Sequence, residues 1–376
     1  MIRALVETKR ILVCAGPGGV GKTTTAAAVG IIAARMGRRT LVSTIDPAPR
    51  LADALGLGNL SAEPRALPEE TARALGITGP GALFAARLDT ARAFRRLVQD
   101  QVTEPQMQER IFANPIYRQI TSTLTGSQEY AATLALHELQ RQNEYDLIVL
   151  DTPPTAHALD FLEAPRRIAN AISSPAVQWF ARPPVTSSFL SWQRLRAGPA
   201  LAVRRLGKFV GSRFLDDLGA FLLDFRDVLG GFLERAQAVE TLLRRQDVGF
   251  LLVLSPDVPA VSEALYFTAR LRAARIPLCG FIANRVLTAP GMIDEAGVRA
   301  KLAALPGLPA DILDTAAREL AQVSAYLERL ARAQRREIER LAHDAPGIDI
   351  TTVPLLTHDV SNVESLGRVG DHLERG

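Results

Sequence analysis

The most constraining feature of this chain is a glycine-rich loop between an apolar strand and a helix. Residues 16–23 read Gly-Pro-Gly-Gly-Val-Gly-Lys-Thr, after the apolar run Ile11–Ala15 and before the alanine-rich run Thr24–Arg35. This is the context that a phosphate-binding loop requires, since glycines let successive backbone N–H groups turn inward around an anion and the helix adds its dipole. The alternative is a glycine-rich turn that binds nothing, but Lys-Thr at this position has little value for packing.

The side chains and the backbone of this loop have different expected roles. Lys22 would reach the β and γ phosphates of a nucleotide, and the Thr23 hydroxyl would ligate Mg²⁺. The residues expected to contact the nucleotide are Gly18, Gly19, Val20, Gly21, Lys22, Thr23 and Thr24. The sequence therefore predicts a site for a nucleotide together with Mg²⁺.

The composition is that of an ordinary globular chain with one large domain or two modest ones. The chain has 376 residues, of which 47% are hydrophobic and 22% are charged. No apolar run approaches the roughly 18 to 20 residues of a membrane span, and Glu7, Lys9 and Arg10 interrupt any signal-peptide layout. These features predict a cytoplasmic protein. Cys14 and Cys279 lie in apolar segments and are expected to be buried structural thiols.

Strand and helix patterns alternate along the chain and predict an α/β fold with a doubly wound, mainly parallel sheet. Strands are expected at 11–15, 39–45, 83–88, 147–150, 250–254, 278–283 and 348–353. Helices are expected at 24–35, 48–55, 128–142, 259–274, 310–342 and at the end of the chain. A further helical pattern follows the strand at 83–88 and runs to about residue 108. We expect a P-loop ATPase core in two parts, 1–158 and 246–376, with a helical insertion subdomain at 159–245.

Two aspartates follow expected strands and are candidates for chemistry on a phosphate. Asp151 ends the apolar run 147–150, so its carboxylate would emerge beside the glycine-rich loop and hold Mg²⁺ through a water. A buried or capping aspartate is the alternative there. Asp46 precedes Pro47 and could orient or deprotonate an attacking water. Alternatively, Asp46 is only the cap of a helix over Ala48–Leu55.

Three further residues are candidates for contact with a nucleotide base. Asn284 follows the strand expected at 278–283, and its amide can both donate to and accept from an adenine edge. An asparagine after a strand is also common in simple turns. Pro354 and Leu356 follow the last strand and could form the apolar wall of a base pocket, although simple packing explains them as well.

One segment, Ala164–Leu215, is strongly basic, whereas the rest of the chain is net acidic. It has nine basic and no acidic residues and holds both tryptophans, Trp179 and Trp192. It follows Asp151–Thr155, a loop able to sense a γ-phosphate, so we expect it to face a partner and to change exposure with nucleotide. The alternatives are a solvated face of arginines with buried stems and a surface for nucleic acid or membrane.

Three motifs together resemble one known family. The stretches Gly16–Thr24, Thr44–Ala48 and Asp151–His157 are similar to the P-loop, switch I and switch II of the arsenite-pump ATPase and tail-anchored-protein targeting ATPase family. Other stretches look closest to its bacterial "anion-transporting ATPase" branch with paired subunits: Leu88–Leu97, Gly126–Tyr130, Ala158–Pro165 and Val353–Val360. The resemblance covers nearly the whole chain.

The resemblance implies a mechanism and site residues. In that family two P-loop cores face each other, bind two ATP with Mg²⁺, and close as dimers that hydrolyse ATP. Carried over by motif, Lys22 and Thr23 would hold phosphate and Mg²⁺, with Asp151 in the Mg²⁺ shell. Asp46 would hold the water, and Asn284 would contact the adenine.

The chain departs from the family pattern in three ways. Pro17 stands where the family usually has a signature lysine that contacts the partner subunit's nucleotide, so slow turnover is expected. The arsenite pumps sense metalloid with three thiols and fuse two P-loops, whereas this chain has two cysteines and one such loop. The Cys-x-x-Cys zinc clamp of the eukaryotic members is missing, so a dimer would rest on packing and nucleotide.

The function expected from the sequence is that of a cytoplasmic, Mg²⁺-dependent ATPase that works as a nucleotide-switched dimer. The dimer would be homomeric or formed with a paralogous subunit, and it would bind a hydrophobic helical client or a membrane protein through Ala164–Leu215. One alternative is a catalytically weak regulatory subunit of a paired complex. Another is a basic adaptor of the partitioning-ATPase type, although nucleic acid is not the expected partner.

Overall fold

The structure is a computed structural model that describes residues 1–46, 48–115, 117–118, 127–152, 170, 226–288, 291, 294–305, 309–360 and 362–375. These residues fall into two compact units. The first unit holds the described residues up to 87, residues 144–152 and the described residues from 244 onward. The second unit holds the described residues of 88–143 and 226–243, together with residue 170.

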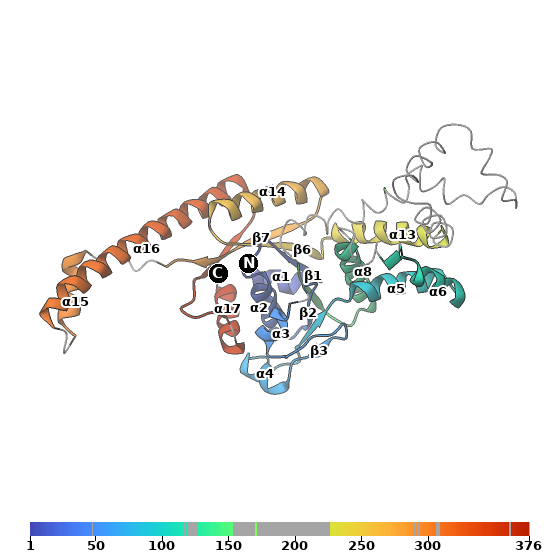
Figure 1. Cartoon of the computed structure of the whole chain (residues 1–376), viewed down its shortest axis with the longest axis horizontal. Helices are drawn as coiled ribbons and strands as arrows, with labels where there is room; N and C mark the ends of the chain where they lie inside the picture. The colour runs from blue at the N-terminus through green and yellow to red at the C-terminus, as the bar shows by residue number, and fades with distance from the viewer. Residues whose placement is uncertain are drawn as a thin grey trace. The chain divides into compact units, whose positions relative to one another are not determined.

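Within its described residues the first unit is built on one eight-stranded sheet (Figure 1). The strands are β1 (Ile11–Ala15), β2 (Arg39–Thr44), β3 (Arg65–Ala66), β4 (Ala82–Arg87), β5 (Leu147–Asp151), β6 (Val248–Leu254), β7 (Leu278–Val286) and β8 (Ile350–Pro354). Their order is β3-β4-β2-β5-β1-β6-β7-β8, and every pair is parallel except β3 with β4. The predicted doubly wound, mainly parallel sheet is confirmed.

The helices of the first unit cover this sheet. They are α1 (Ile2–Thr8), α2 (Lys22–Arg35), α3 (Arg50–Leu55), α4 (Glu69–Ala74), α14 (Val258–Ala274), α15 (Glu295–Ala303), α16 (Ala310–Asp344) and α17 (Val363–Arg375). The small side chains of α2 let it pack closely on β1, β2, β4 and β5, with α1, α3 and α17 around it. Helix α14 packs on β6 and β7, and α16 packs on α14.

The core follows from the strand sequences. Leu12 and Cys14 of β1 belong to the hydrophobic core cluster that also contains the buried residues of α2. Ile11 and Val13 alternate with them along the strand and are equally buried. Successive strand residues point to opposite faces, so β1 is covered on both faces. This double burial explains why the strand reads as a continuous apolar run.

The second unit is helical in its described residues. Its helices are α5 (Thr90–Gln101), α6 (Pro105–Ala113), α8 (Ser127–Gln142) and α13 (Arg226–Leu243). Helix α5 packs on α8 and α13, and the Arg235 guanidinium of α13 lies 2.5 Å from the Asp100 carboxylate of α5. The helix predicted to run to about residue 108 is two helices, because Pro105 starts a new one.

Several elements were missing from the sequence prediction. These are α1, β3, α4 and α15, all of nine residues or fewer. None of the described helices is long and apolar enough to cross a membrane. The expected insertion at 159–245 and the basic segment Ala164–Leu215 lie largely or wholly outside the described residues, so both stay predictions.

Candidate nucleotide site at the carboxyl edge of the sheet

The glycine-rich loop connects β1 to α2 and leaves the first N–H groups of α2 without a side-chain cap. Gly21 is the N-cap with φ of 94°, and α2 begins at Lys22. A Cβ on Gly21 would lie 2.4 Å from Nδ2 of Asn284, and one on Gly16 would lie 1.9 Å from the Val253 carbonyl oxygen. Only glycine fits at these two positions. The uncapped helix start is a ready site for an anion.

Lys22 is a buried cation at this helix start. Its side chain is only 7% exposed, and Nζ donates to the Pro17 carbonyl oxygen at 2.7 Å. Burial lowers the pKa of Lys22, the nearby Arg50 lowers it further, and the Asp151 carboxylate opposes both effects. An ammonium held by one carbonyl in a mostly dry loop is well placed to meet phosphate oxygens.

Asp151 ends β5 beside this loop, as the sequence predicts. Its Oδ2 accepts hydrogen bonds from the hydroxyls of Thr23 at 2.7 Å and Thr44 at 3.1 Å. Its Oδ1 is buried without a hydrogen-bond partner among the described residues. Burial raises the pKa of Asp151 to about 6, while the bonds from Thr23 and Thr44 act in the opposite direction.

The donor atoms around Asp151 fit Mg²⁺. A hydroxyl and a carboxylate are the hard oxygen ligands that this ion prefers. The orphaned Oδ1 gives the carboxylate a free acceptor for an ion or for a water in its shell, and Thr23 Oγ1 lies beside it. Thr23 and Asp151 are therefore the residues that would hold Mg²⁺ next to the phosphates.

Asp46 lies in the loop after β2, on the same edge of the sheet. Its Oδ1 accepts from the Ala48 N–H at 2.9 Å, and its backbone N–H donates to the Thr44 hydroxyl at 3.1 Å. The Arg50 guanidinium lies 3.7 Å from Asp46 Oδ2. Helix α3 begins at Arg50 with Pro49 as its N-cap, so Asp46 is not the N-cap of that helix. Its Oδ2 faces the Arg50 guanidinium and accepts no hydrogen bond from the described residues.

The three candidates for the nucleotide base are placed differently. Asn284 lies near the end of β7, and its Nδ2 donates to the Val20 carbonyl oxygen at 2.8 Å, so it contacts the loop directly. Pro354 ends β8, and the next residue but one, Leu356, packs on the core cluster that surrounds α2. Among the described residues no hydrogen bond joins Pro354 or Leu356 to the loop. The adenine roles of all three residues stay predictions.

Two residues that the sequence reasoning missed connect the site. The Thr44 hydroxyl donates to Asp151 Oδ2 and accepts from the Asp46 backbone, so it couples the two aspartates. Arg50 places a second cation beside Asp46. Their positions in the sequence could have identified both residues. Thr44 lies two residues before Asp46 at a carboxyl strand end, and Arg50 lies four residues after Asp46.

Replacing Asp151 by Asn should stabilise the metal-free protein at neutral pH. The pKa of this carboxyl is higher in the folded chain than its ordinary 3.8, so its contribution favours folding below about pH 4 and is lost as the pH rises through about 6. Allowing for an unpaired amide in place of Oδ1, we expect Asp151→Asn to raise the unfolding free energy by about 1 to 2 kcal/mol at pH 7.5.

This gain should disappear near pH 4. Chemical denaturation in EDTA at the two pH values measures it, and Asp53→Asn on the exposed side of α3 is the matched control. A variant that is less stable than wild type at pH 7.5 would show that burial does not destabilise the carboxylate.

Comparisons with known proteins agree with this geometry. Residues 9–178 match the family described as anion-transporting ATPase. The chain is 35% identical to an uncharacterized protein of Streptomyces coelicolor over 166 residues, which cover 43% of this chain and 39% of the relative. It is 28% identical to ATPase GET3 of Malassezia globosa over 165 residues, covering 43% of this chain and 44% of the relative.

A longer and more distant match covers most of the chain. The putative arsenical pump-driving ATPase 1 of Aquifex aeolicus is 21% identical over 368 residues, which cover 96% of this chain and 77% of the relative. The first two matches span less than half the length of those relatives. The matched residues 9–178 include the loop around Lys22, Asp46 and Asp151. The resemblance predicted from the sequence is thus confirmed: residues 9–178 match the anion-transporting ATPase family, and the chain is similar to proteins named arsenical pump-driving ATPase and ATPase GET3.

Proposed function

We propose that this chain is an Mg²⁺-dependent ATPase that works as a nucleotide-switched dimer and binds a protein or membrane-associated client. The observation that carries the proposal is the hydrogen-bonded chain from Thr23 through Asp151 and Thr44 to Asp46, beside the buried ammonium of Lys22. Phosphoryl transfer needs a phosphate cradle, a metal position and a water-orienting group within one site. These residues supply candidates for all three.

Each residue has a defined task in this proposal. Lys22 and the N-terminus of α2 bind the phosphate oxygens and neutralise charge that develops during transfer. Thr23 and Asp151 hold Mg²⁺, which when bound draws negative charge from the phosphates. Asp46 orients the attacking water and accepts its proton at Oδ2, while Thr44 fixes the backbone position of Asp46 relative to Asp151.

We expect the chain to hydrolyse ATP slowly because of Pro17. Its carbonyl oxygen holds Lys22, but its side chain offers no cation toward a second subunit's nucleotide. The competing function is that of a regulatory subunit with negligible turnover. Steady-state hydrolysis of Mg-ATP by the purified chain, with the Lys22→Ala variant as the blank, separates the two. A rate equal to that of the blank would favour the regulatory subunit.

The client surface is proposed from the sequence, at Ala164–Leu215 and outside the described residues. Movement of the loop that follows Asp151 has a short route into this segment, so ATP should couple to partner affinity by about 1 to 3 kcal/mol. We expect hydrogen exchange and tryptophan fluorescence of the segment to change with an Mg-ATP analogue. Identical protection in both states would reduce the segment to a static cover.

A variant that binds ATP without hydrolysing it can identify the partner. A pull-down with the Asp46→Asn variant in Mg-ATP should retain a client that wild type releases after hydrolysis. Salt-dependent binding to DNA or to anionic liposomes would instead favour the basic adaptor. The arginine-rich composition of Ala164–Leu215 motivates this second assay.

A further inference from the structure

The side-chain amide of Asn284 is packed against the glycine-rich loop. Its Nδ2 donates to the Val20 carbonyl oxygen at 2.8 Å, and a Cβ on Gly21 would lie 2.4 Å from the same nitrogen. Its Oδ1 accepts from the Arg285 N–H at 3.0 Å, so both ends of the amide are held. A shift of the loop around a bound phosphate therefore reaches Asn284 by direct contact.

Arg285 is a strained backbone position near the end of β7. Its φ of 60° lies in the left-handed region, which costs free energy for a residue other than glycine. The pairing of β7 with β8 changes register between Ala283 and Val286, on either side of Arg285. Strain of this kind is characteristic of segments that switch between two conformations. The end of β7 is therefore the place in this strand where a displacement of Asn284 can be taken up.

Helix α16 is joined to this strand end. The Leu287 N–H, directly after β7, donates to Gln334 Oε1 of α16 at 2.7 Å. Six residues farther along the helix, the Arg340 guanidinium donates to the Ser262 hydroxyl of α14 at 2.9 Å. The neighbouring Leu341 is fully buried. Helix α16 is thus anchored near its C-terminal end and is connected to β7 at Gln334.

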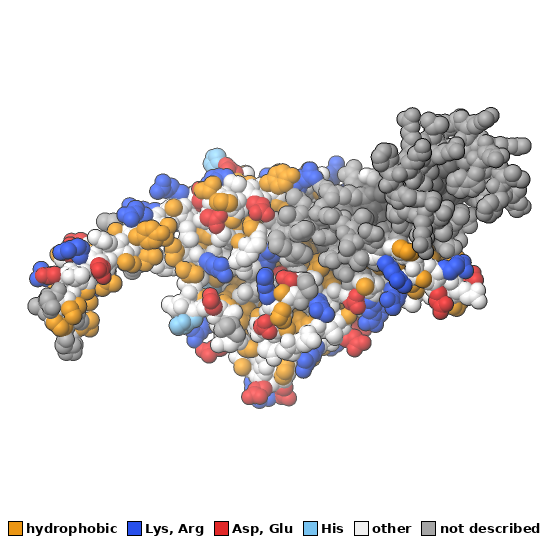
Figure 2. Space-filling model, in the orientation of Figure 1, with side chains coloured by type: hydrophobic (Ala, Val, Ile, Leu, Met, Phe, Trp, Pro, Cys, Tyr) orange, Lys and Arg blue, Asp and Glu red, His pale blue; other side chains and the backbone are white. Residues whose placement is uncertain are grey.

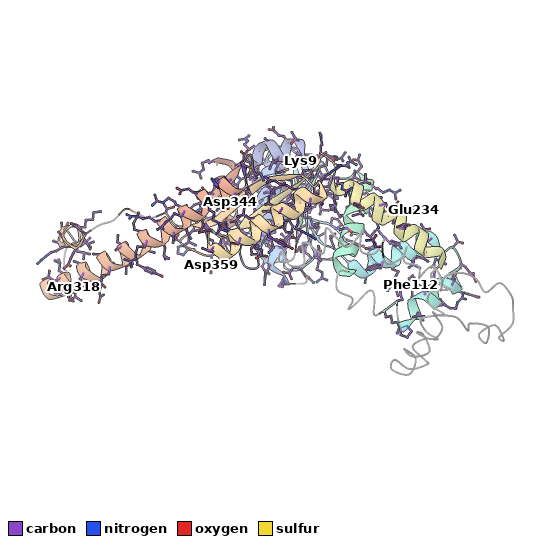
Figure 3. The ribbon with its side chains drawn as sticks, turned by 90° about the horizontal axis from the view of Figure 1, so that it is seen from above. Lys9, Phe112, Glu234, Arg318, Asp344 and Asp359 are labelled. Atoms are coloured by element: carbon purple, nitrogen blue, oxygen red, sulfur yellow. The ribbon has the colours of Figure 1, made fainter. Side chains whose placement is uncertain are left out.

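The remaining part of α16 is a straight arm. The helix has 35 residues without an internal proline or glycine, so the usual causes of a kink are missing. Five large apolar side chains of its N-terminal half are 37% to 53% exposed: Ile312, Leu320, Val323, Tyr326 and Leu330. Figure 2 shows hydrophobic side chains along this half, and Figure 3 labels Arg318 in it and Asp344 at the anchored end. Helix α15 packs on α16 and would move with it.

These attachments give α16 the geometry of a lever. With a rise of 1.5 Å per residue, Gln334 lies about 9 Å along the helix from Arg340, and Ala310 lies about 45 Å from Arg340. If Arg340 is the pivot, a displacement of about 1 Å at Gln334 moves the start of the helix by about 5 Å. Shifts of that size at a nucleotide site are ordinary, and rigid elements amplify them.

We propose that Asn284, Arg285 and Gln334 couple the glycine-rich loop to the hairpin of α15 and α16, so that a bound nucleotide moves the exposed apolar side chains of α16. Phosphates draw the loop closed, Asn284 follows it, and the end of β7 carries Gln334 along. The coupling is reciprocal, so a protein bound on the hairpin changes the affinity of the loop for nucleotide by the same factor. The inference rests on the proposed function for its ligand.

The first test measures the movement of the arm. Spin labels at Glu70→Cys on α4 and Gln322→Cys on α16, both exposed, report one distance in a Cys279→Ala background; Cys14 is fully buried. A slowly hydrolysed Mg-ATP analogue should change this distance by about 3 Å, since residue 322 lies about three times as far from the pivot as Gln334. With the second label at Glu339→Cys, beside the pivot, the change should stay below about 1 Å. No change at 322, or equal changes at 322 and 339, would overturn the inference.

The second test cuts the connection between β7 and α16. Gln334→Ala removes the acceptor of the Leu287 N–H and should abolish the distance change at residue 322. Gln334→Glu keeps an acceptor oxygen at the same position and should retain the change. Calorimetry with the same analogue checks that both variants still bind nucleotide. A Gln334→Ala variant that binds nucleotide and moves like wild type would contradict the proposed route.

The third test needs no nucleotide and separates this inference from the proposed function. Gly21→Ala places a Cβ against Asn284 Nδ2 and should displace the label at residue 322 in EDTA. Gly19→Ala is the matched control, because Gly19 is also left-handed but its Cβ would meet nothing within 4 Å. If Gly21→Ala moves the arm but the wild-type chain binds no Mg-ATP, the ATPase proposal fails and the coupling stands. If the wild-type chain hydrolyses ATP and neither the analogue nor Gly21→Ala moves residue 322, the coupling alone is wrong.

Discussion

The Lys22→Ala variant should lose Mg-ATP affinity by about a hundredfold or more and keep its fold. Lys22 is 7% exposed, and within the part of the chain that the structure describes its ammonium donates one hydrogen bond, to the Pro17 carbonyl, so it meets phosphate oxygens without giving up a strong partner. Charge-assisted hydrogen bonds of this kind are each worth roughly 1.5 to 3 kcal/mol, and Lys22 can make more than one. Isothermal titration calorimetry of both proteins with a slowly hydrolysed ATP analogue measures the loss.

The control for this prediction is Lys301→Ala on the exposed surface of α15, which removes the same charge far along the chain from the loop. Its ATP affinity should equal that of wild type. Circular dichroism and thermal unfolding should show that Lys22→Ala remains folded. If wild type and Lys22→Ala bind the analogue equally well, the loop at 16–23 is not the phosphate site.

The Asp46→Asn variant should hydrolyse ATP roughly a hundredfold or more slowly and bind ATP almost normally. Asparagine keeps the oxygen that accepts from the Ala48 N–H, and the backbone bond to Thr44 is untouched. The variant loses the ion pair with Arg50 and the anionic acceptor for a water proton. General bases contribute about 10² to 10⁴ in rate, far more than an exposed ion pair contributes. Single-turnover hydrolysis together with binding of the same ATP analogue separates the two effects.

Arg50→Gln is the matched control, because it removes the ion pair with Asp46 and keeps the carboxylate. A structural role of Asp46 predicts comparable, small effects from both substitutions. A role in hydrolysis predicts a much larger loss for Asp46→Asn. Unchanged steady-state turnover in Asp46→Asn would return Asp46 to a structural position in the loop after β2.

Local chemistry made much of this site predictable from the sequence. The apolar run before residue 16, the glycines and the alanine-rich helix specify strand, loop and helix through contacts between near neighbours. The positions of Asp46 and Asp151 after apolar runs place both at carboxyl strand ends, since parallel strands share that edge. Short elements such as α4 and α15 were not predicted, because one or two helical turns contain too few residues to show the periodicity of an amphipathic helix.

The sequence by itself determined the glycine-rich loop between strand and helix, the doubly wound sheet and the two strand-end aspartates. Only the tertiary structure decided that Thr44 joins those aspartates, because β2 and β5 are neighbours through pairing between residues 107 positions apart. It also decided which half of α16 keeps an exposed apolar face. The spacing of the apolar residues of α16 can be read from the sequence. Which of these residues are buried depends on elements that pack against the helix from elsewhere in the chain. Helix α15 packs on α16 and forms an ion pair with Asp314, whereas α14 contacts α16 at Arg340.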